Sequence, residues 1–273
     1  MGLTLFSTTG CRRCSIVKSA MEDWSRTWEE LDIKAGAREV FNGFYREHRS
    51  RIYRGEDGVE FPVLLTGDKI LQGPGVILAW LKAGEPLLDF FSPSQLSGDW
   101  ISGITLSVVD HNNVGLHIPE LLGRLKKGGL KIEVETDGRN PSLLEILAKE
   151  ALVDRLIVVL RGPAQRYQEI TGASLNVDDM GKTLALIRHV PEYRLELHLS
   201  PVFSGAGRGY LPVEEAAGTA AMVEAETGSK KHPFLISAGI PVDEALAPLS
   251  TAELFRYRTA CRRHMVMAEI AKP

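Results

Sequence analysis

The stretch Leu3-Thr-Leu-Phe-Ser-Thr-Thr-Gly-Cys-Arg-Arg-Cys14, continued by residues 15–24, decides the fold of the first part of this chain. The apolar run at 3–6 predicts a strand, and residues 15–24 have the apolar spacing of a helix. Two cysteines separated by two residues therefore lie where a strand passes into a helix. This order places the first sulfur at a helix N-terminus, where backbone N–H groups stabilise a thiolate.

The Cys11-Arg-Arg-Cys14 motif predicts a thiol redox site. We expect Cys11 to be the nucleophile and Cys14, one turn into the helix, to be the resolving thiol. Arg12 and Arg13 add positive charge, which lowers a thiol pKa below its free value of about 8.5. The alternatives are a structural metal pair, two inert buried thiols, and arginines in a solvated turn. A closed tetrahedral metal site needs four ligands, and Cys261 is the only other cysteine.

Composition limits the remaining function classes. The 273 residues are 44% hydrophobic and carry a net charge of −3, so charge gives no case for binding nucleic acid or an anionic membrane. No stretch approaches the roughly 20 apolar residues that cross a bilayer. Three cysteines cannot form a disulfide framework, and a reducing compartment suits a dithiol that must be regenerated. We expect a soluble, cytoplasmic protein.

The residues after the first helix predict a small mixed domain. Residues 29–34 predict a second strand, and residues 37–53 predict a helix with Val40, Phe41, Phe44 and Tyr45 on one stripe. Pro62-Val-Leu-Leu65, a turn at Gly67-Asp68 and residues 69–73 predict a hairpin. A helix over 74–82 opens with proline in its first turn.

This part of the chain resembles the thioredoxin-like fold, in its glutaredoxin branch. The resemblance rests on Cys11-Arg-Arg-Cys14, Phe61-Pro62-Val63 and the Gly67-Asp68 hairpin, and we assign residues 1–88 to this domain. It implies that Pro62 follows a cis bond, faces the dithiol and shapes a peptide-binding groove; the alternative is a proline that opens an edge strand. Where glutaredoxins bind glutathione, this chain has Gln72-Gly73-Pro74-Gly75 without an aspartate. Exchange with a protein disulfide is therefore at least as well supported as exchange with glutathione, and we expect the partner to be a protein disulfide or a low-molecular-weight thiol.

Residues 93–273 form the second predicted domain. Strand-like and helix-like segments alternate, which predicts an α/β fold with a mostly parallel sheet, either a partial β/α barrel or an open sheet. The expected strands are 100–109, 130–135, 156–160, 194–199 and 233–236, and the expected helices are 118–127, 142–150, 178–188, 213–227 and 251–270. Asp178 and either Ser250 or Thr251 are the expected N-caps.

Several segments here resemble the activating enzymes of glycyl-radical proteins, in the radical S-adenosylmethionine superfamily. The order of Trp100-Ile-Ser-Gly-Ile104, Gly129-Leu-Lys-Ile-Glu-Val-Glu-Thr-Asp-Gly138 and Tyr167-Gln-Glu-Ile-Thr-Gly172 supports this resemblance. Those enzymes hold a four-iron cluster with Cys-x-x-x-Cys-x-x-Cys, which this chain lacks, and Gly103-Ile104-Thr105-Leu106 replaces their Gly-Gly-Glu-Pro. We therefore expect a truncated relative that holds neither a 4Fe-4S cluster nor S-adenosylmethionine. We also expect no other metal site.

Polar side chains on two predicted strands suggest a ligand site in this domain. Parallel strands covered on both faces are nearly all apolar, yet acidic residues alternate over 131–137, and Arg194, Glu196 and His198 alternate on a later strand. If these faces line a barrel, Glu135, Asp137, Arg161 and His198 converge near the carboxyl ends of the strands. The alternatives are internal ion pairs and a polar face open to solvent.

Together these observations predict a thiol-disulfide oxidoreductase of glutaredoxin-like type joined to a catalytically inactive barrel that recognises a partner or ligand. The two resembled families make a glycyl-radical enzyme or a ribonucleotide reductase system a candidate partner. A second hypothesis is a binding or scaffold protein whose dithiol is a redox or metal sensor. A third is an iron–sulfur cluster that bridges two subunits through Cys11.

Overall fold

The computed structural model describes residues 2–55, 58–93, 98–204, 207–239, 241 and 246–271, without the side chains of 202–208. The chain forms two compact units. The first comprises Met1–Thr105 and Val109–Glu133, and the second comprises Leu106–Val108 and Val134–Pro273. The expected boundary between residues 88 and 93 stays a prediction. Among the described residues, no helix is both long and apolar enough to cross a membrane.

The first unit contains a four-stranded sheet in the order β2-β1-β5-β6. Strand β1 is parallel to β2 and antiparallel to β5, and β6 is antiparallel to β5. This is the predicted thioredoxin-like arrangement. The elements up to residue 83 that build it are β1 (Leu3–Ser7), α1 (Arg12–Asp23), β2 (Glu29–Asp32), α2 (Arg38–His48), β5 (Val63–Thr66), β6 (Lys69–Gln72) and α3 (Pro74–Ala83).

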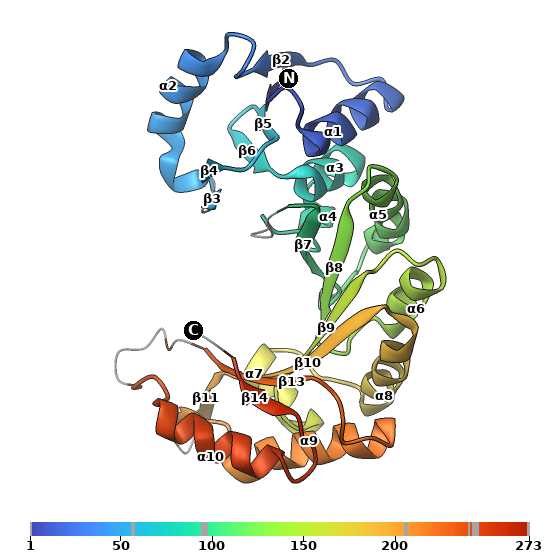
Figure 1. Ribbon diagram of the computed structural model, residues 1–273, viewed down its shortest axis with the longest axis vertical. Helices are drawn as coiled ribbons and strands as arrows, with labels where there is room; N and C mark the ends of the chain where they lie inside the picture. Colours follow the sequence, from blue (N-terminus) through green and yellow to red (C-terminus); the bar gives the residue numbers. More distant parts are fainter. Residues whose placement is uncertain are drawn as a thin grey trace. The chain divides into compact units, whose positions relative to one another are not determined.

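Both faces of this sheet are covered by helices. Phe6 of β1 lies opposite Val63 of β5, and both pack with Phe41 of α2. Because side chains alternate along a strand, Leu5 and Leu64 face the other side, and both are fully buried. Figure 1 shows α2 on one side of the strands and α1 with α3 on the other. The predicted apolar stripe of α2 was wrong at Val40, which is 56% exposed.

The first unit continues beyond the thioredoxin-like elements. It adds η1 (Arg49–Arg51), β3 (Arg54–Gly55), β4 (Gly58–Val59), α4 (Glu85–Leu88), β7 (Trp100–Thr105), η2 (Val114–His117) and α5 (Ile118–Lys127). Phe90 and Phe91 are buried, and Phe91 forms a β-bridge with Ile104. Helix α5 packs on α3, and the backbone at Gly128 closely approaches the side chain of Ile16 in α1. The helix that carries Cys14 therefore packs against residues that the sequence assigned to the second domain.

A six-stranded sheet follows in the order β14-β13-β10-β9-β8-β7. Its further strands are β8 (Lys131–Thr136), β9 (Arg155–Leu160), β10 (Glu192–Leu199), β13 (Phe234–Ala238) and β14 (Ala268–Ile270). The pairings of β9 with β10, β10 with β13 and β13 with β14 are parallel. The predicted α/β class with a mostly parallel, partial-barrel sheet is confirmed.

The second unit adds helices to these strands. These are α6 (Pro141–Lys149), α7 (Tyr167–Thr171), α8 (Val177–Leu186), α9 (Val213–Thr227) and α10 (Thr251–Cys261), with η3 (Ala164–Arg166), η4 (Ile187–His189) and the hairpin β11 (Pro201–Ser204) and β12 (Gly207–Tyr210). Helices α8, α9 and α10 pack in succession (Figure 1). On β10, Leu195, Leu197 and Leu199 are fully buried, whereas the alternate polar side chains are partly exposed.

Two predictions at helix ends need correction. The helix expected over 251–270 ends at Cys261, and residues 268–270 form β14 instead. Helix α8 is capped by Asn176, whose side chain accepts from the Asp178 N–H, and not by Asp178 itself. The prediction of Ser250 as a cap is confirmed, because Ser250 and Glu253 form a capping box.

Replacing Phe41 tests the packing of α2 on the sheet. We expect Phe41→Ala to reduce the free energy of unfolding by about 3 kcal/mol, because it removes a buried ring and leaves a cavity. Val40→Ala, on the same helix but exposed, should change it by less than about 0.5 kcal/mol. Urea unfolding followed by circular dichroism measures both. Equal effects of the two substitutions would contradict this packing.

Candidate functional site

Cys11 occupies the N-cap of helix α1. Its backbone is extended, with φ −81° and ψ 108°, and its sulfur accepts a hydrogen bond from the Cys14 N–H at 3.1 Å. The first N–H groups of a helix have no partner within the helix and carry the positive end of its dipole. A thiolate at Cys11 therefore receives both a hydrogen bond and a favourable field.

The two cysteines of the motif differ in exposure. Their sulfurs are joined as a disulfide, with the Cα atoms 5.3 Å apart. Cys11 is partly exposed, whereas Cys14 is 1% exposed. An incoming disulfide can therefore reach Cys11 more readily than Cys14. This asymmetry is what the predicted roles of nucleophile and resolving thiol require.

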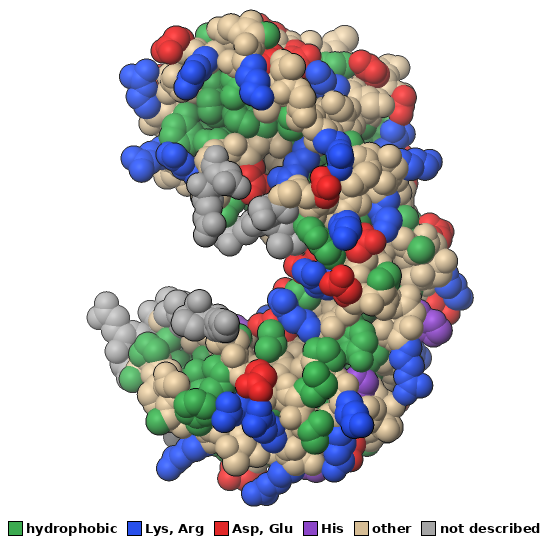
Figure 2. All heavy atoms as spheres, in the orientation of Figure 1, with side chains coloured by type: hydrophobic (Ala, Val, Ile, Leu, Met, Phe, Trp, Pro, Cys, Tyr) green, Lys and Arg blue, Asp and Glu red, His purple; other side chains and the backbone are tan. Residues whose placement is uncertain are grey.

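The loop before β5 lies against the dithiol. The Phe61–Pro62 bond is cis, and the Cys11 sulfur lies 3.9 Å from the Phe61 carbonyl oxygen. Pro62 itself is buried, and Phe61 is partly exposed. Figure 2 shows hydrophobic side chains gathered between α2 and the strands β5 and β6. They belong to an apolar cluster around the buried Phe6, Phe41 and Val63. The partly buried residues of this cluster are Leu31, Ile33, Phe44, Tyr45, Val59, Phe61 and Ile70.

Arg13 forms a largely buried ion pair beside the dithiol. Its guanidinium lies 3.1 Å from the Glu60 carboxylate, and the two side chains are 14% and 19% exposed. The same guanidinium donates to the carbonyls of Gly98 and Trp100. Burial raises the pKa of the Glu60 carboxyl, and the charge and hydrogen bond of Arg13 oppose this rise. We therefore expect Glu60 to compete with a Cys11 thiolate for the positive charge of Arg13.

Arg12 is exposed and points to a different set of partners. Its guanidinium lies 2.7 Å from the Asp99 carboxylate and 3.3 Å from the Gly129 carbonyl oxygen. Both arginines of the motif thus connect α1 to the segment that enters β7. Their predicted effect on the Cys11 thiol stays a prediction.

Gln72 fixes the loop on the other side of Glu60. This buried side chain accepts from the Tyr53 N–H and donates to the carbonyls of Tyr53 and Glu60. Its hydrogen bonds are therefore used within the protein. The following helix α3 has no acidic residue in its first turn and no side-chain cap, so this place offers no aspartate for a glutathione-like ligand.

Cys261 lies apart from this chemistry. It is fully buried, and its thiol donates to the Ala216 carbonyl. Burial raises the pKa of the Cys261 thiol to about 12. This thiol is therefore protonated near neutral pH. Among the described residues, no group of three or more His, Cys, Asp or Glu side chains could hold a metal ion.

Of the four residues predicted for a ligand site, the structure brings Arg161 and His198 together. Leu160 pairs with Leu197 across β9 and β10, so Arg161 and His198 follow at neighbouring positions. The charge of Arg161 contributes to a lowered His198 pKa, whose largest cause is burial. Asp137 instead forms an ion pair with Arg139 at 2.5 Å, and Glu135 is exposed.

Two neighbours of this pair were not predicted. Ser237 of β13 lies opposite His198 and bonds to its Nδ1 at 2.9 Å. The buried Tyr167 hydroxyl accepts from the Arg161 N–H at 3.1 Å. Strand register joins residues far apart in sequence, so no local signal could have identified Ser237. Tyr167 belongs to the Tyr167–Gly172 segment of the sequence analysis, but the sequence does not show that its side chain is buried next to Arg161.

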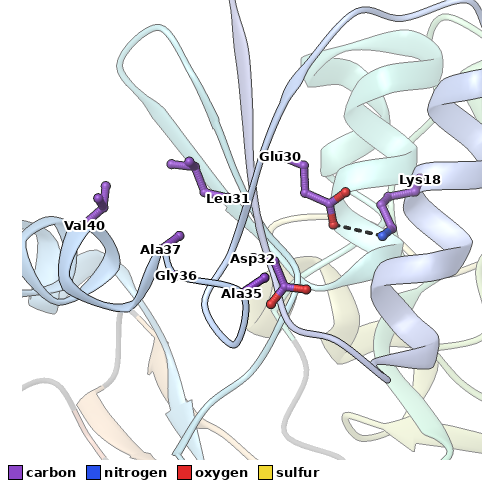
Figure 3. Close-up of a pocket in the computed structure, with 8 residues that line it drawn as sticks. All are labelled: Lys18, Glu30, Leu31, Asp32, Ala35, Gly36, Ala37 and Val40. Atoms are coloured by element: carbon purple, nitrogen blue, oxygen red, sulfur yellow. Dashed lines mark hydrogen bonds and ion pairs between the residues drawn. The ribbon is translucent and has the colours of Figure 1, made fainter.

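A separate pocket lies at the open edge of β2 (Figure 3). It has a volume of about 540 Å³ and is lined by Lys18, Glu30, Leu31, Asp32, Ala35, Gly36, Ala37 and Val40. Hydrogen bonds lower the pKa of both acids, chiefly from Lys18 to Glu30 and from Thr9 to Asp32. Neither cysteine of the dithiol lines this pocket, so it is distinct from the thiol site.

The sheet order, the dithiol at the start of α1 and the adjoining proline loop make the N-terminal region a glutaredoxin-like fold with a thiol oxidoreductase-like site. Comparison with protein-family models and with curated proteins gives no match. Comparison with solved structures finds partial likenesses to both halves of the chain.

One of these structures is the glutaredoxin-like NrdH-redoxin from Escherichia coli, at 22% identity over 27% of this chain and 84% of that chain, with a TM-score of 0.21. A domain of pyruvate-formate lyase-activating enzyme from Bacteroides vulgatus is 13% identical over 63% of this chain and 100% of that chain, with a TM-score of 0.43. TYW1 is 12% identical over 58% of this chain, with a TM-score of 0.40, and the chain spans about half of its length, 49%.

Glu60→Gln tests the competition for Arg13. The change removes the carboxylate charge and keeps a polar group, so more of the Arg13 field acts on a Cys11 thiolate. We expect the midpoint of Cys11 alkylation to fall by about half a pH unit in a Cys14→Ser background. Iodoacetamide rates measured against pH give this midpoint. Glu30→Gln is the control. It removes a carboxylate of β2 that pairs with Lys18 of α1, and it should leave the alkylation midpoint unchanged. A midpoint that stays constant or rises in Glu60→Gln would contradict the competition.

Proposed function

We propose that this protein is a thiol-disulfide oxidoreductase that uses Cys11 and Cys14, with a second unit that recognises a partner or ligand. The hydrogen bond from the Cys14 N–H to the Cys11 sulfur, at the N-cap of α1, is the observation that carries this proposal. It supports a reactive thiolate at an accessible position. The buried neighbour, one turn along the helix, is within bonding distance.

The reaction begins in the reduced protein. The Cys11 thiolate attacks one sulfur of a substrate disulfide, which forms a mixed disulfide and releases the other substrate sulfur as a thiolate. Cys14 then loses its proton and attacks the Cys11 sulfur. The Cys11–Cys14 disulfide forms, and the second substrate sulfur leaves as a thiolate. The substrate has gained two electrons, and the protein has lost two.

The described structure is the oxidised form in this cycle. A low-molecular-weight thiol or a reductase must return two electrons to the dithiol before another turnover. The apolar surface near Phe61 favours a protein disulfide as substrate, because hydrophobic side chains can bury part of a peptide. A glycyl-radical enzyme or a ribonucleotide reductase system stays a candidate partner from the family resemblance alone.

We further propose that the second unit acts without a 4Fe-4S cluster or S-adenosylmethionine. The chain has three cysteines, and two belong to the dithiol. A cluster held by three thiolates would therefore need the dithiol itself and the buried Cys261. This donor set does not fit such a group, so the proposed role of the unit is recognition.

Trapping a mixed disulfide tests the order of the two steps. Cys14→Ser should accumulate a covalent complex with a protein disulfide such as insulin, because the resolving thiol is absent, whereas Cys11→Ser should form none. Non-reducing gels and mass spectrometry measure the complex. Wild-type protein should reduce insulin faster than dithiothreitol alone does, and Cys11→Ser should not. The Cys14→Ser complex is trapped without dithiothreitol, because a free thiol would resolve the mixed disulfide.

Cys261→Ser is the matched control and should keep full turnover, because this thiol is buried and protonated. A complex that forms through Cys14 in the Cys11→Ser protein would reverse the assigned roles. Reversible oxidation of the pair without reduction of any added disulfide would favour a redox sensor over an oxidoreductase. Stoichiometric zinc uptake by the reduced protein would favour a metal sensor.

A further inference from the structure

Three side chains lie side by side where β9, β10 and β13 end. Leu160 pairs with Leu197, so Arg161 comes next to His198 on one side. Ser237 pairs with His198 on the other side. The carboxyl ends of parallel strands are where α/β folds place ligands, because the loops there leave the strand ends accessible.

A hydrogen-bond relay fixes the protonation of His198. The Ser237 hydroxyl donates to the Glu196 carboxylate at 2.8 Å, since a carboxylate can only accept. The Ser237 oxygen must then accept the hydrogen bond of 2.9 Å from His198 Nδ1. His198 therefore carries its proton on Nδ1 and presents a lone pair on Nε2. Burial and the Arg161 charge lower the pKa of His198, which favours this neutral form.

Gly239 lies beside His198 Nε2. A Cβ placed at Gly239 would lie 3.1 Å from His198 Nε2 and 3.5 Å from Pro201 Cδ. Any larger residue at position 239 would therefore crowd the lone pair. His198 itself is partly exposed, so a donor from outside the protein has access to this side chain.

Arg161 has no carboxylate partner among the described residues. Arg161 is partly buried, and its guanidinium donates to the Ser200 hydroxyl at 3.4 Å. Other arginines of this unit do have one: Arg139 pairs with Asp137, Arg155 with Glu192 and Arg194 with Glu196. A partly buried cation without a counterion favours binding of an anion, and a guanidinium fits a carboxylate through two hydrogen bonds.

We propose that Arg161 and His198 form a binding site for a small 2-hydroxy carboxylate. The carboxylate binds Arg161, and the hydroxyl on the neighbouring carbon donates to His198 Nε2. A hydroxyl is preferred to an ammonium group, because a second cation next to Arg161 is repelled. This assigns a ligand class to the recognition role proposed above and rests on that role, but it does not depend on the dithiol.

Titration of the full chain with glycolate tests the site, with the His198 imidazole nitrogens observed by ¹H–¹⁵N correlation. Before ligand is added, the spectrum should show the Nδ1–H tautomer. Glycolate should shift the Nε2 resonance saturably. Acetate, which lacks the hydroxyl, should bind about threefold to tenfold more weakly, and glycine should bind more weakly than glycolate. The same shifts should occur in Cys11→Ser, so failure here is separate from failure of the redox function.

Substitutions locate the binding. Arg161→Gln should weaken glycolate binding by about tenfold or more, because a charged hydrogen-bond pair is lost. Gly239→Ala should also weaken it by blocking Nε2. Arg155→Gln, at the other end of β9, is the matched control and should bind as the wild type does. The Nε2–H tautomer, no saturable shift, equal binding of acetate and glycolate, or equal effects of Arg161→Gln and Arg155→Gln would each overturn the proposal.

Discussion

The hydrogen bond from the Cys14 amide to the Cys11 sulfur is the interaction on which the chemistry of the N-terminal region depends. It exists because β1 ends shortly before α1 begins, so that Cys11 takes the N-cap position with an extended backbone. A cysteine one residue further on would be inside the helix, and its sulfur would face other atoms. The position of one residue at a helix start therefore decides whether the motif is reactive. The packing of α1 keeps this position fixed.

Both arginines of the motif form contacts that help to hold α1 in place. Arg12 forms an exposed pair with Asp99, and such pairs contribute about 0–1 kcal/mol. The Arg13 pair with Glu60 is largely buried, and loss of one partner would leave the other charge without compensation. Arg13 is therefore the stronger connection between α1 and the segment that enters β7. The positive charge of Arg13 is therefore already paired with Glu60 within the protein.

Local patterns in the sequence predicted most of the elements. The helices over 118–127 and 213–227 have the predicted bounds, since their apolar spacing and flanking residues are all local. The prediction failed at 251–270, where residues 268–270 pair with β13 and leave the helix to end at Cys261. Strand pairing also brings Ser237 next to His198. The ion pair of Arg13 with Glu60 likewise joins residues that are 47 positions apart in the sequence. Without this register, the sequence predicts candidate site residues but not the side chains that lie next to them.

The polar face of β10 is what remains to be explained once the fold is known. Burying a polar side chain of such a strand without a hydrogen-bond partner destabilises the folded protein. Glu196 has Arg194 and Ser237 as partners, so internal pairing accounts for it. Internal pairing does not account for Arg161, because no described carboxylate pairs with it. It does not account for His198 Nε2 either, because this nitrogen has no hydrogen-bond partner among the described residues. The alternative of a self-compensating polar interior therefore fits one part of this face and fails at the strand ends, where a ligand can supply the missing charge.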